Sequence, residues 1–203
     1  MTEKERMLAG ELYSAFDEDL RNDYIRAKKL LLEYNVTAED DRPARNKIIK
    51  ELFGGTGDRF SIKPPFSCDY GYNIFIGNKF FCNNNCIILD VCKVTIGNNV
   101  LIGPRVSLYT AGHPVDPEIR SCGFSIGKPI TIGDNVWIGG DTVINPGVTV
   151  GNNTVIGSGS VVTKDIPENV IAAGNPCRVI RPITKEDKEY WENLRDQYYK
   201  TME

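Results

Sequence analysis

Aliphatic residues recur at every sixth position through one long stretch of this chain. They occupy the positions Ile132, Ile138, Ile144, Val150, Ile156 and Val162. An α-helix would show spacings of three and four residues, and an ordinary half-buried strand would alternate in twos. A strict period of six is typical of short strands broken by tight corners, which is the signature of a hexapeptide β-helix.

The residues that follow the aliphatic positions have the composition of sharp corners. Glycine comes next at four of them, and Asp-Asn or Asn-Asn follows two of those: Gly133, Gly139, Gly151, Gly157, Asp134-Asn135 and Asn152-Asn153. Gly, Asn and Asp tolerate the positive φ that such corners require. A loop-rich β-sandwich is the alternative, but six repeats in phase favour the β-helix.

A longer interval fixes the shape of each coil. The corner that begins at Ile132 returns at Val150, 18 residues or three hexapeptides later, so three strands per coil make a triangular prism. A coil begun at Ile96 should close at residue 113, yet its corner returns only at Ile132. Residues 114–131 are therefore predicted to be an 18-residue excursion. Such long excursions are usually functional, with a surface decoration as the alternative.

Both ends of the chain differ from the repeat region. Residues 1–58 have helical spacing and begin with a Thr2–Glu5 capping box, so they predict an N-terminal helical segment. Residues 59–183 form the predicted β-helix. Residues 184–203 predict a C-terminal helix that caps the open end of the prism. The expected fold class is mainly β, a parallel β-helix with a helical segment before it and a helical cap after it.

Composition narrows the function classes. The net charge of −3 provides no basic field for nucleic acid. The chain has no run of about 18 apolar residues and no signal-peptide layout, which predicts a soluble cytoplasmic protein without membrane contact. Three of the six cysteines fall in or beside repeat positions, where a thiol serves as a small core group. With one histidine and no Cys-x-x-Cys pair, we expect no metal site.

His113 is the only histidine, and it lies where the coil breaks into the excursion. Ala111-Gly112 and Pro114 beside it give access, and Asp116 and Glu118 follow nearby. Imidazole titrates near neutrality and can accept a proton from an alcohol. The spacing alone leaves a structural and a catalytic role equally open.

Several longer motifs run through the chain. They are Cys68-Asp-Tyr-Gly-Tyr-Asn-Ile-Phe75, Tyr109-Thr-Ala-Gly-His-Pro114, Gly127-Lys-Pro-Ile-Thr-Ile-Gly-Asp-Asn-Val-Trp-Ile-Gly-Gly140 and Ala173-Gly-Asn-Pro-Cys-Arg-Val-Ile180. Together they resemble the maltose and galactoside O-acetyltransferases, with details closer to the maltose branch. The resemblance implies a left-handed parallel β-helix and a homotrimer with acetyl-CoA sites between neighbouring prisms.

The resemblance also implies roles for individual residues. His113 matches the general base, which would remove the proton of a sugar hydroxyl, the primary one, as that oxygen attacks the thioester carbonyl. Asn83 matches the asparagine beside the acceptor and the acyl group. Asp69 and Asp90 would accept hydrogen bonds from the sugar acceptor, and a backbone N–H near Gly139-Gly140 would hold the oxyanion.

For the coenzyme, the resemblance implies two further groups of residues. Matches to the pantetheine-lining positions are Gly140, Ser158, Thr163 and Lys164, and matches to the phosphate-binding positions are Arg178 and Arg181. A guanidinium is suited to phosphate oxygens. Without the resemblance, Asn83 is one corner asparagine among three, and the two arginines are solvated basic residues near a cap.

The chain departs from the galactoside branch in ways that leave the acceptor open. Ala15 and Val91 stand where that branch has acids, and Asp17 could compensate for the first. An antibiotic, a lipo-oligosaccharide or serine is the alternative acceptor on this fold, although the N-terminal helices and the Cys68–Phe75 motif favour a sugar such as maltose or glucose. A γ-class carbonic anhydrase is excluded because it needs three histidines. A non-catalytic trimeric scaffold is the remaining alternative.

Overall fold

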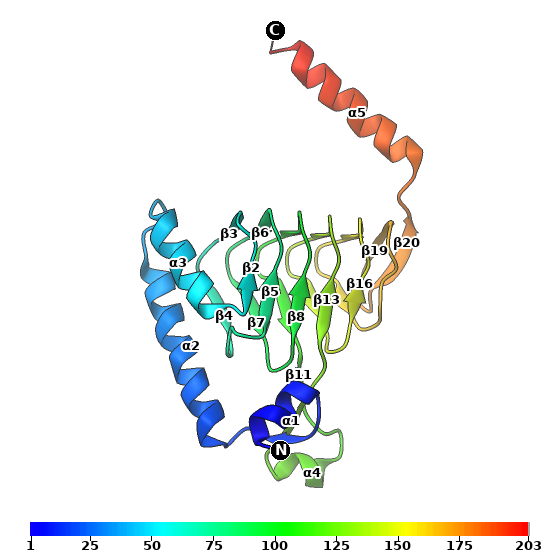
Figure 1. Cartoon of the computed structure of the whole chain (residues 1–203). Coiled ribbons are helices and arrows are strands. Elements are labelled where there is room, and N and C mark those ends of the chain that lie inside the picture. Colours follow the sequence, from blue (N-terminus) through cyan, green and yellow to red (C-terminus); the bar gives the residue numbers. More distant parts are fainter. Residues whose placement is uncertain (203) are drawn as a thin grey trace.

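The computed structural model describes residues 1–202 and shows a parallel β-helix with helices at both ends (Figure 1). Each coil contributes one strand to each of three sheets. Sheet I contains β2 (Gly55–Thr56), β5 (Ile74–Ile76), β8 (Val94–Ile96), β13 (Ile130–Ile132) and β16 (Thr149–Val150). Sheet II contains β3 (Phe60–Ile62), β6 (Phe80–Cys82), β9 (Leu101–Ile102), β14 (Trp137–Ile138), β17 (Val155–Ile156), β19 (Val170–Ala173) and β20 (Arg178–Pro182). Sheet III contains β4 (Phe66–Cys68), β7 (Cys86–Leu89), β10 (Ser107–Tyr109), β15 (Val143–Ile144) and β18 (Val161–Val162). The chain visits the sheets in the order I, II, III, so the prism has corners I–II, II–III and III–I.

The residues of the six-residue period fill the interior of the prism. Ile132, Ile138 and Ile144 lie on sheets I, II and III and are at most 1% exposed. Ile132 stacks in parallel register on Val150, and Ile138 on Ile156, each 18 residues further along. Full burial of such a side chain stabilises the fold by roughly 1.5–3 kcal/mol. The predicted triangular β-helix is confirmed.

Glycine and asparagine have different structural roles at the corners. At corner I–II the left-handed residues are asparagines such as Asn135 (φ 58°) and Asn153 (φ 55°), except for Lys79 (φ 58°). Gly133 is needed for another reason, since a Cβ there would lie 2.4 Å from Oδ1 of Asn152 in the next coil. The expected positive φ thus falls on the asparagines, while this glycine permits the coils to stack closely.

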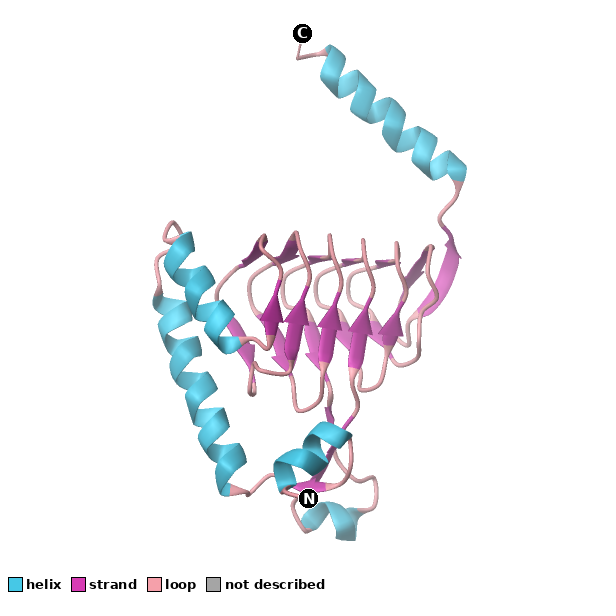
Figure 2. Cartoon of the chain, in the orientation of Figure 1, coloured by secondary structure: helices cyan, strands magenta, loops and turns pink. Residues whose placement is uncertain are grey.

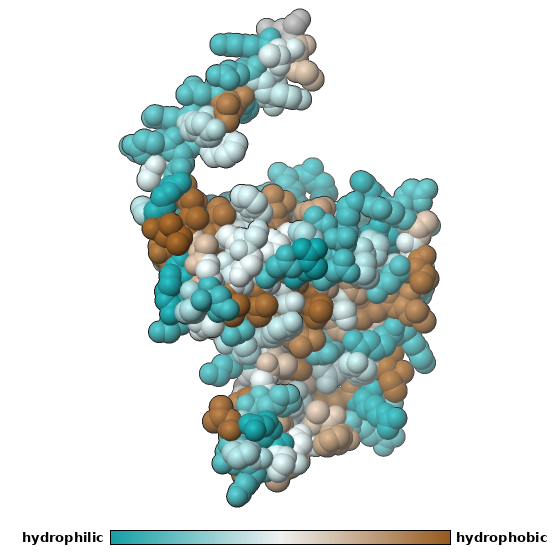
Figure 3. All heavy atoms as spheres, turned by 180° about the vertical axis from the view of Figure 1, so that it is seen from behind, coloured by the Kyte–Doolittle hydropathy of each residue, from teal (hydrophilic) through white to brown (hydrophobic). Residues whose placement is uncertain are grey.

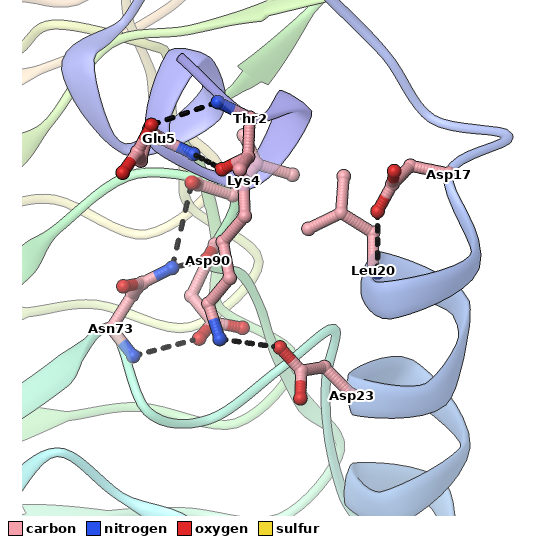
Figure 4. A network of polar contacts seen from close by, with 9 residues as sticks. Thr2, Lys4, Glu5, Asp17, Leu20, Asp23, Asn73 and Asp90 are labelled. Carbon is pink, nitrogen blue, oxygen red and sulfur yellow. Dashed lines mark hydrogen bonds and ion pairs between the residues drawn. The ribbon is translucent and has the colours of Figure 1, made fainter.

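Three helices lead into the β-helix: α1 (Glu3–Ala9), α2 (Glu18–Val36) and α3 (Arg42–Leu52). The Thr2–Glu5 capping box is present at α1 (Figure 4). Helices α2 and α3 cover the first coil, and Tyr34 and Leu52 join the interior cluster (Figure 1). Sheet I begins at Gly55, so the β-helix starts inside the predicted helical segment of residues 1–58. Within residues 1–202, no helix is both long and apolar enough to cross a membrane.

The excursion leaves corner III–I after Thr110. It contains β11 (Ala111–Gly112), α4 (Pro117–Ser121) and β12 (Phe124–Gly127). Strand β12 pairs antiparallel with β11 and with β1 (Tyr13–Ser14) of the N-terminal segment. The chain rejoins the ladder at Ile130, which is fully buried and pairs with Val94. The excursion thus begins three residues earlier than the predicted 114–131, and Ile130 and Thr131 belong to strand β13 of sheet I.

The C-terminal helix α5 (Lys185–Lys200) has no buried residue and projects away from the prism (Figure 1, Figure 2). The prediction that this helix caps the open end was therefore wrong. Strand β20 instead pairs antiparallel with β19 and covers the edge of the last coil. Five of the six cysteines are buried free thiols, and the exposed one is Cys122.

Candidate active site

His113 follows β11 at the point where corner III–I is broken. Its side chain is exposed, and Nδ1 lies 3.4 Å from the Phe124 carbonyl oxygen and 3.4 Å from Ser125 Oγ, both on β12. A carbonyl oxygen can only accept, so we assign the ring proton to Nδ1, which donates to Phe124. That tautomer leaves the lone pair of Nε2 free to act as a base.

Two adjoining cavities lie beside this histidine. The larger, of about 470 Å³, is lined by Tyr13, Ala15, Phe16, Leu20, Arg21, Tyr24, Asp69, Tyr70, Val91, Ala111 and Ser125. The other, of about 350 Å³, is lined by Ala15, Phe16, His113, Arg120, Gly123, Phe124 and Ser125. They share Ala15, Phe16 and Ser125, so a molecule in the larger cavity can extend an atom toward the imidazole.

Asp69 is the one carboxylate that lines the larger cavity. Burial raises the pKa of Asp69, and the nearby charge of Lys28 opposes the rise. Lys28 donates to the Cys68 carbonyl at 2.6 Å, which fixes its ammonium beside the β4 end. The half-buried Asp69 carboxylate can accept hydrogen bonds from hydroxyl groups, which is the chemistry that an acceptor-binding residue needs.

Asp90 does not line either cavity, contrary to the direct acceptor contact predicted for it. Its side chain is fully buried, and Oδ1 accepts from the backbone N–H groups of Asp69 at 3.0 Å and Tyr70 at 2.9 Å. Oδ2 accepts from Asn73 N at 3.3 Å (Figure 4). Asp90 therefore holds the turn that carries Asp69, and burial raises the pKa of its carboxyl to about 7.

Asp17 and Asp116 are helix caps. Asp17 Oδ1 accepts from Leu20 N at 3.0 Å and starts α2 (Figure 4), and Asp17 is absent from the cavity lining. Asp116 caps α4 through Ile119 N at 2.9 Å. Asp17 thus does not line the cavity at Ala15 where the acid is missing, and neither carboxylate is bonded to His113 to orient the imidazole.

A second group of predicted residues lies at corner II–III. Asn83, Gly140 and Ser158 occupy this corner in the second, fourth and fifth coils, and Gly159 N donates to the Gly140 carbonyl at 2.8 Å. Asn83 Oδ1 accepts from Asn84 N at 2.9 Å, which leaves its amide N–H groups available. The Gly139 N–H donates to Ile156 O at 2.8 Å, which leaves Gly140 as the donor to consider for an oxyanion.

The remaining coenzyme-binding candidates are divided between other places. Thr163 and Lys164 are exposed at corner III–I, on the side of His113. Arg178 begins β20 and donates to the Cys177 carbonyl at 2.8 Å. Arg181 is held by Asp187 of α5, with Nη2 2.8 Å from Oδ1. Within one chain these residues thus lie at two corners separated by sheet III, except Arg181, which lies on sheet II in register with Ile171.

Sequence reasoning missed the aromatic and hydroxyl walls of the larger cavity. Tyr13 and Ser125 come from β1 and β12, which pair although they are far apart in the sequence. Burial raises the pKa of Tyr13 to about 12, so its phenol stays neutral. No periodic signal marks these positions. In residues 1–202 no group of three His, Cys, Asp or Glu side chains could hold a metal.

Known proteins share these features. Residues 6–57 match the maltose acetyltransferase hexapeptide capping motif, and residues 129–164 match six bacterial transferase hexapeptide repeats. Galactoside O-acetyltransferase of Escherichia coli is 50% identical over 187 residues, or 92% of each chain. A crystal structure of a maltose O-acetyltransferase from Clostridium difficile 630 superposes with a TM-score of 0.90 at 53% identity, covering 91% of this chain and 98% of that one. Galactoside acetyltransferase in complex with coenzyme A has a TM-score of 0.90 at 50% identity, covering 93% and 94%. The chain therefore belongs to the maltose and galactoside O-acetyltransferase family of acetyl-CoA-dependent acetyltransferases.

Proposed function

We propose that this chain transfers the acetyl group of acetyl-CoA to a hydroxyl group, the primary one, of a small sugar such as maltose or glucose, with His113 as general base. The observation that carries the proposal is the position of the His113 imidazole. It opens into a cavity that adjoins the one lined by Asp69 across Ser125. A sugar bound through hydroxyl groups to Asp69 can extend another hydroxyl toward Nε2.

The reaction needs one base and one oxyanion donor. Nε2 of His113 takes the proton of the acceptor hydroxyl as its oxygen attacks the thioester carbonyl, which forms a tetrahedral oxyanion. The Gly140 N–H is the donor proposed for this oxyanion. Collapse of the intermediate expels the coenzyme thiolate. The imidazolium then gives its proton to this thiolate. Acetyl transfer is then complete without an acyl-enzyme, and no cysteine is required.

The two-corner distribution supports an assembly in which neighbouring copies share a site. His113, Thr163 and Lys164 lie at corner III–I, whereas Asn83, Gly140 and Ser158 lie at corner II–III. Parallel prisms around a threefold axis bring these two corners together with either sheet III or corner I–II toward the axis. The exposed apolar face of sheet II favours the second arrangement, in which sheet I of one copy faces sheet II of the next. We therefore propose a homotrimer with three sites between its subunits.

The outer faces of these two sheets have complementary side chains. On sheet II, Phe81, Leu101 and Trp137 are in register, and Leu101 is 49% exposed and Trp137 55% exposed. On sheet I, the outward column in register is small except for one aromatic residue, and it contains Gly55, Phe75, Thr95, Thr131 and Thr149. Strands in both sheets have the same spacing of about 4.8 Å, so the bulky column of one face can fit against the small column of the other.

Steady-state kinetics of His113→Ala test the proposed mechanism. With acetyl-CoA and a panel of maltose, glucose and methyl galactosides, the variant is expected to lose about 10²- to 10⁴-fold in kcat. Its melting temperature should not change, because the side chain is exposed and makes only long hydrogen bonds. The position of the acetyl group in the product is read by NMR.

Ser125→Ala is the matched control, since Ser125 lines both cavities and lies against the same imidazole nitrogen. Loss of this hydroxyl is expected to reduce kcat by less than about tenfold, the effect of one neutral hydrogen bond. Turnover by His113→Ala at the wild-type rate would refute the general-base role. Binding of acetyl-CoA without turnover on any acceptor would favour a scaffold instead.

A further inference from the structure

Helix α5 carries an apolar stripe that no other part of residues 1–202 buries. Tyr190, Trp191, Leu194 and Tyr198 lie on one side of the helix at spacings of one, three and four residues, and they are 58%, 67%, 39% and 58% exposed. The opposite side carries charged residues, among them the ion pair Lys188–Glu192. A stripe of this width is typical of a helix that packs on a surface.

An isolated helix of this length is marginal in water. Helix α5 is 16 residues long and has no buried residue. Its first turn is secured by the Thr184 capping box and by the ion pair of Asp187 with Arg181. The rest of the helix lacks intramolecular support, so its stripe requires a partner surface.

The ion pair also orients the stripe. Tyr190, Trp191 and Leu194 follow Asp187 by three, four and seven residues, so they lie on the helix face that Asp187 turns toward Arg181. Arg181 is in register with Ile171, which belongs to the outward column of sheet II. The stripe of α5 and the outward column of sheet II therefore lie on the same side of β20.

Between α5 and sheet II the molecule is open. The helix rises from the end of β20 and leans over the sheet at an angle (Figure 1), and the view from behind shows the same open space between helix and body (Figure 3). The sheet side of this wedge exposes Leu101 and Trp137, and the helix side exposes Tyr190 and Trp191. Both walls of the wedge are thus apolar.

We propose that α5 is a clasp that closes on a second copy of this chain. The inference rests on the proposed assembly, in which sheet I of a neighbour is seated on sheet II. The neighbour then occupies the wedge, and the stripe of α5 docks on its flank. We infer a second copy because the sheet side of the wedge is a flat ladder of strands with the same regular spacing as the wall of another β-helix. A single helix or an extended peptide would cover this ladder only in part.

Two tyrosines of α5 provide a matched test. Tyr198 lies on the stripe and is 58% exposed, while Tyr199 lies on the charged side and is 61% exposed. The variants Tyr190→Ser/Tyr198→Ser and Tyr199→Ser are compared with wild type by sedimentation velocity over a wide range of protein concentration. The first variant is expected to raise the dissociation constant of the assembly at least tenfold, as loss of central aromatic contacts does at interfaces, and the second to leave it unchanged.

A truncation that ends at Ile183 removes the clasp altogether and should weaken assembly at least as much as the double variant. At saturating acetyl-CoA and at concentrations where both are assembled, the kcat of the Tyr190→Ser/Tyr198→Ser variant should equal that of wild type. If wild type assembles and both tyrosine variants match it, the clasp is refuted while the proposed assembly stands. If wild type remains a single chain at every concentration, both the clasp and the proposed assembly fail.

Discussion

The two corners that flank sheet III hold their coils together by different means. At corner II–III, successive coils are joined directly through the backbone. Asn85 N donates to Pro65 O at 2.8 Å, Asp141 N to Pro104 O at 3.0 Å, and Gly159 N to Gly140 O at 2.8 Å. The result is a uniform edge on which glycine and serine leave room for a thin ligand.

At corner III–I of the first coils, buried side chains add to backbone bonds such as that of Thr110 N to Leu89 O at 3.0 Å. The Asp90 carboxylate accepts from Asp69 and Tyr70 of the coil before it. Thr110 Oγ1 donates to Leu89 O at 2.6 Å and accepts from Cys92 N at 3.0 Å. Because the coils are bridged from inside, the chain can lengthen its turns here and insert the excursion that carries His113. In the proposed site, the regular corner supplies Asn83 and Gly140 and the bridged corner supplies His113.

Asp90→Asn should have the largest effect on stability among the tests of this comparison. The pKa of Asp90 in the fold is about 7 because of burial, against the usual 3.8. The folded chain therefore keeps a proton that the unfolded chain has lost, and the stabilisation is complete below about pH 4 and lost as pH rises to about 7. The difference between a pKa of 3.8 and one of about 7 corresponds to about 4 kcal/mol in the free energy of unfolding.

Denaturant unfolding of both proteins from pH 4 to pH 8 measures this effect. The free energy of unfolding of wild type minus that of Asp90→Asn should fall across this window, because the amide of the variant keeps an acceptor oxygen but cannot titrate. Asp134→Asn is the control: Asp134 accepts from Asn98 N in the same way at corner I–II, but at the exposed surface. A difference that is flat with pH would contradict the bridging role assigned to a buried, protonated Asp90.

Gly139→Ala and Gly112→Ala compare the two corners directly. A Cβ on Gly139, at corner II–III, would lie 2.5 Å from Ser158 N, so the backbone of one coil must shift. We expect Gly139→Ala to lower the free energy of unfolding by about 1–3 kcal/mol, and each kcal/mol to lower Tm by roughly 2–4 °C. A Cβ on Gly112, beside His113, would meet nothing closer than Ile126 O at 3.7 Å. The free energy of unfolding of Gly112→Ala should therefore stay within about 0.5 kcal/mol of wild type. Equal losses by thermal unfolding would remove the distinction between the corners.

This contrast also explains which features the sequence could predict. The prism follows from short-range rules, because the residue types that fill its interior and turn its corners recur at a fixed spacing in every coil. The excursion was found as a break in that period. The burial of Asp90 could not be found in this way, since an acid at a corner has the same local signature whether it turns outward or inward.

The cavity walls depend on contacts between distant segments. Tyr13 of the N-terminal segment meets Ser125 of the excursion only because β1 pairs with β12. The projection of α5 was likewise hidden, because an amphipathic helix after a solenoid has the same pattern whether it packs on its own last coil or on another molecule. Sequence periodicity reports that a face needs a partner and does not identify that partner.

Asp187→Asn tests the predicted coenzyme contact of Arg181, which lies on β20 of sheet II, and should have the smallest effect. Arg181 is proposed to bind a coenzyme phosphate, yet its guanidinium is held by the Asp187 carboxylate. The arginine lowers the pKa of Asp187, so this carboxylate stays ionised and competes with phosphate at neutral pH. The amide of the variant can still accept the capping bond from Thr184 N, and the competing charge is gone. The KM for acetyl-CoA should therefore fall about two- to fivefold, the range for an exposed ion pair, at unchanged kcat.

Arg181→Ala should raise the same KM. If Asp187→Asn raises it as well, the ion pair positions Arg181 for the phosphate and does not compete with it. If neither substitution changes the KM, Arg181 serves only to anchor α5.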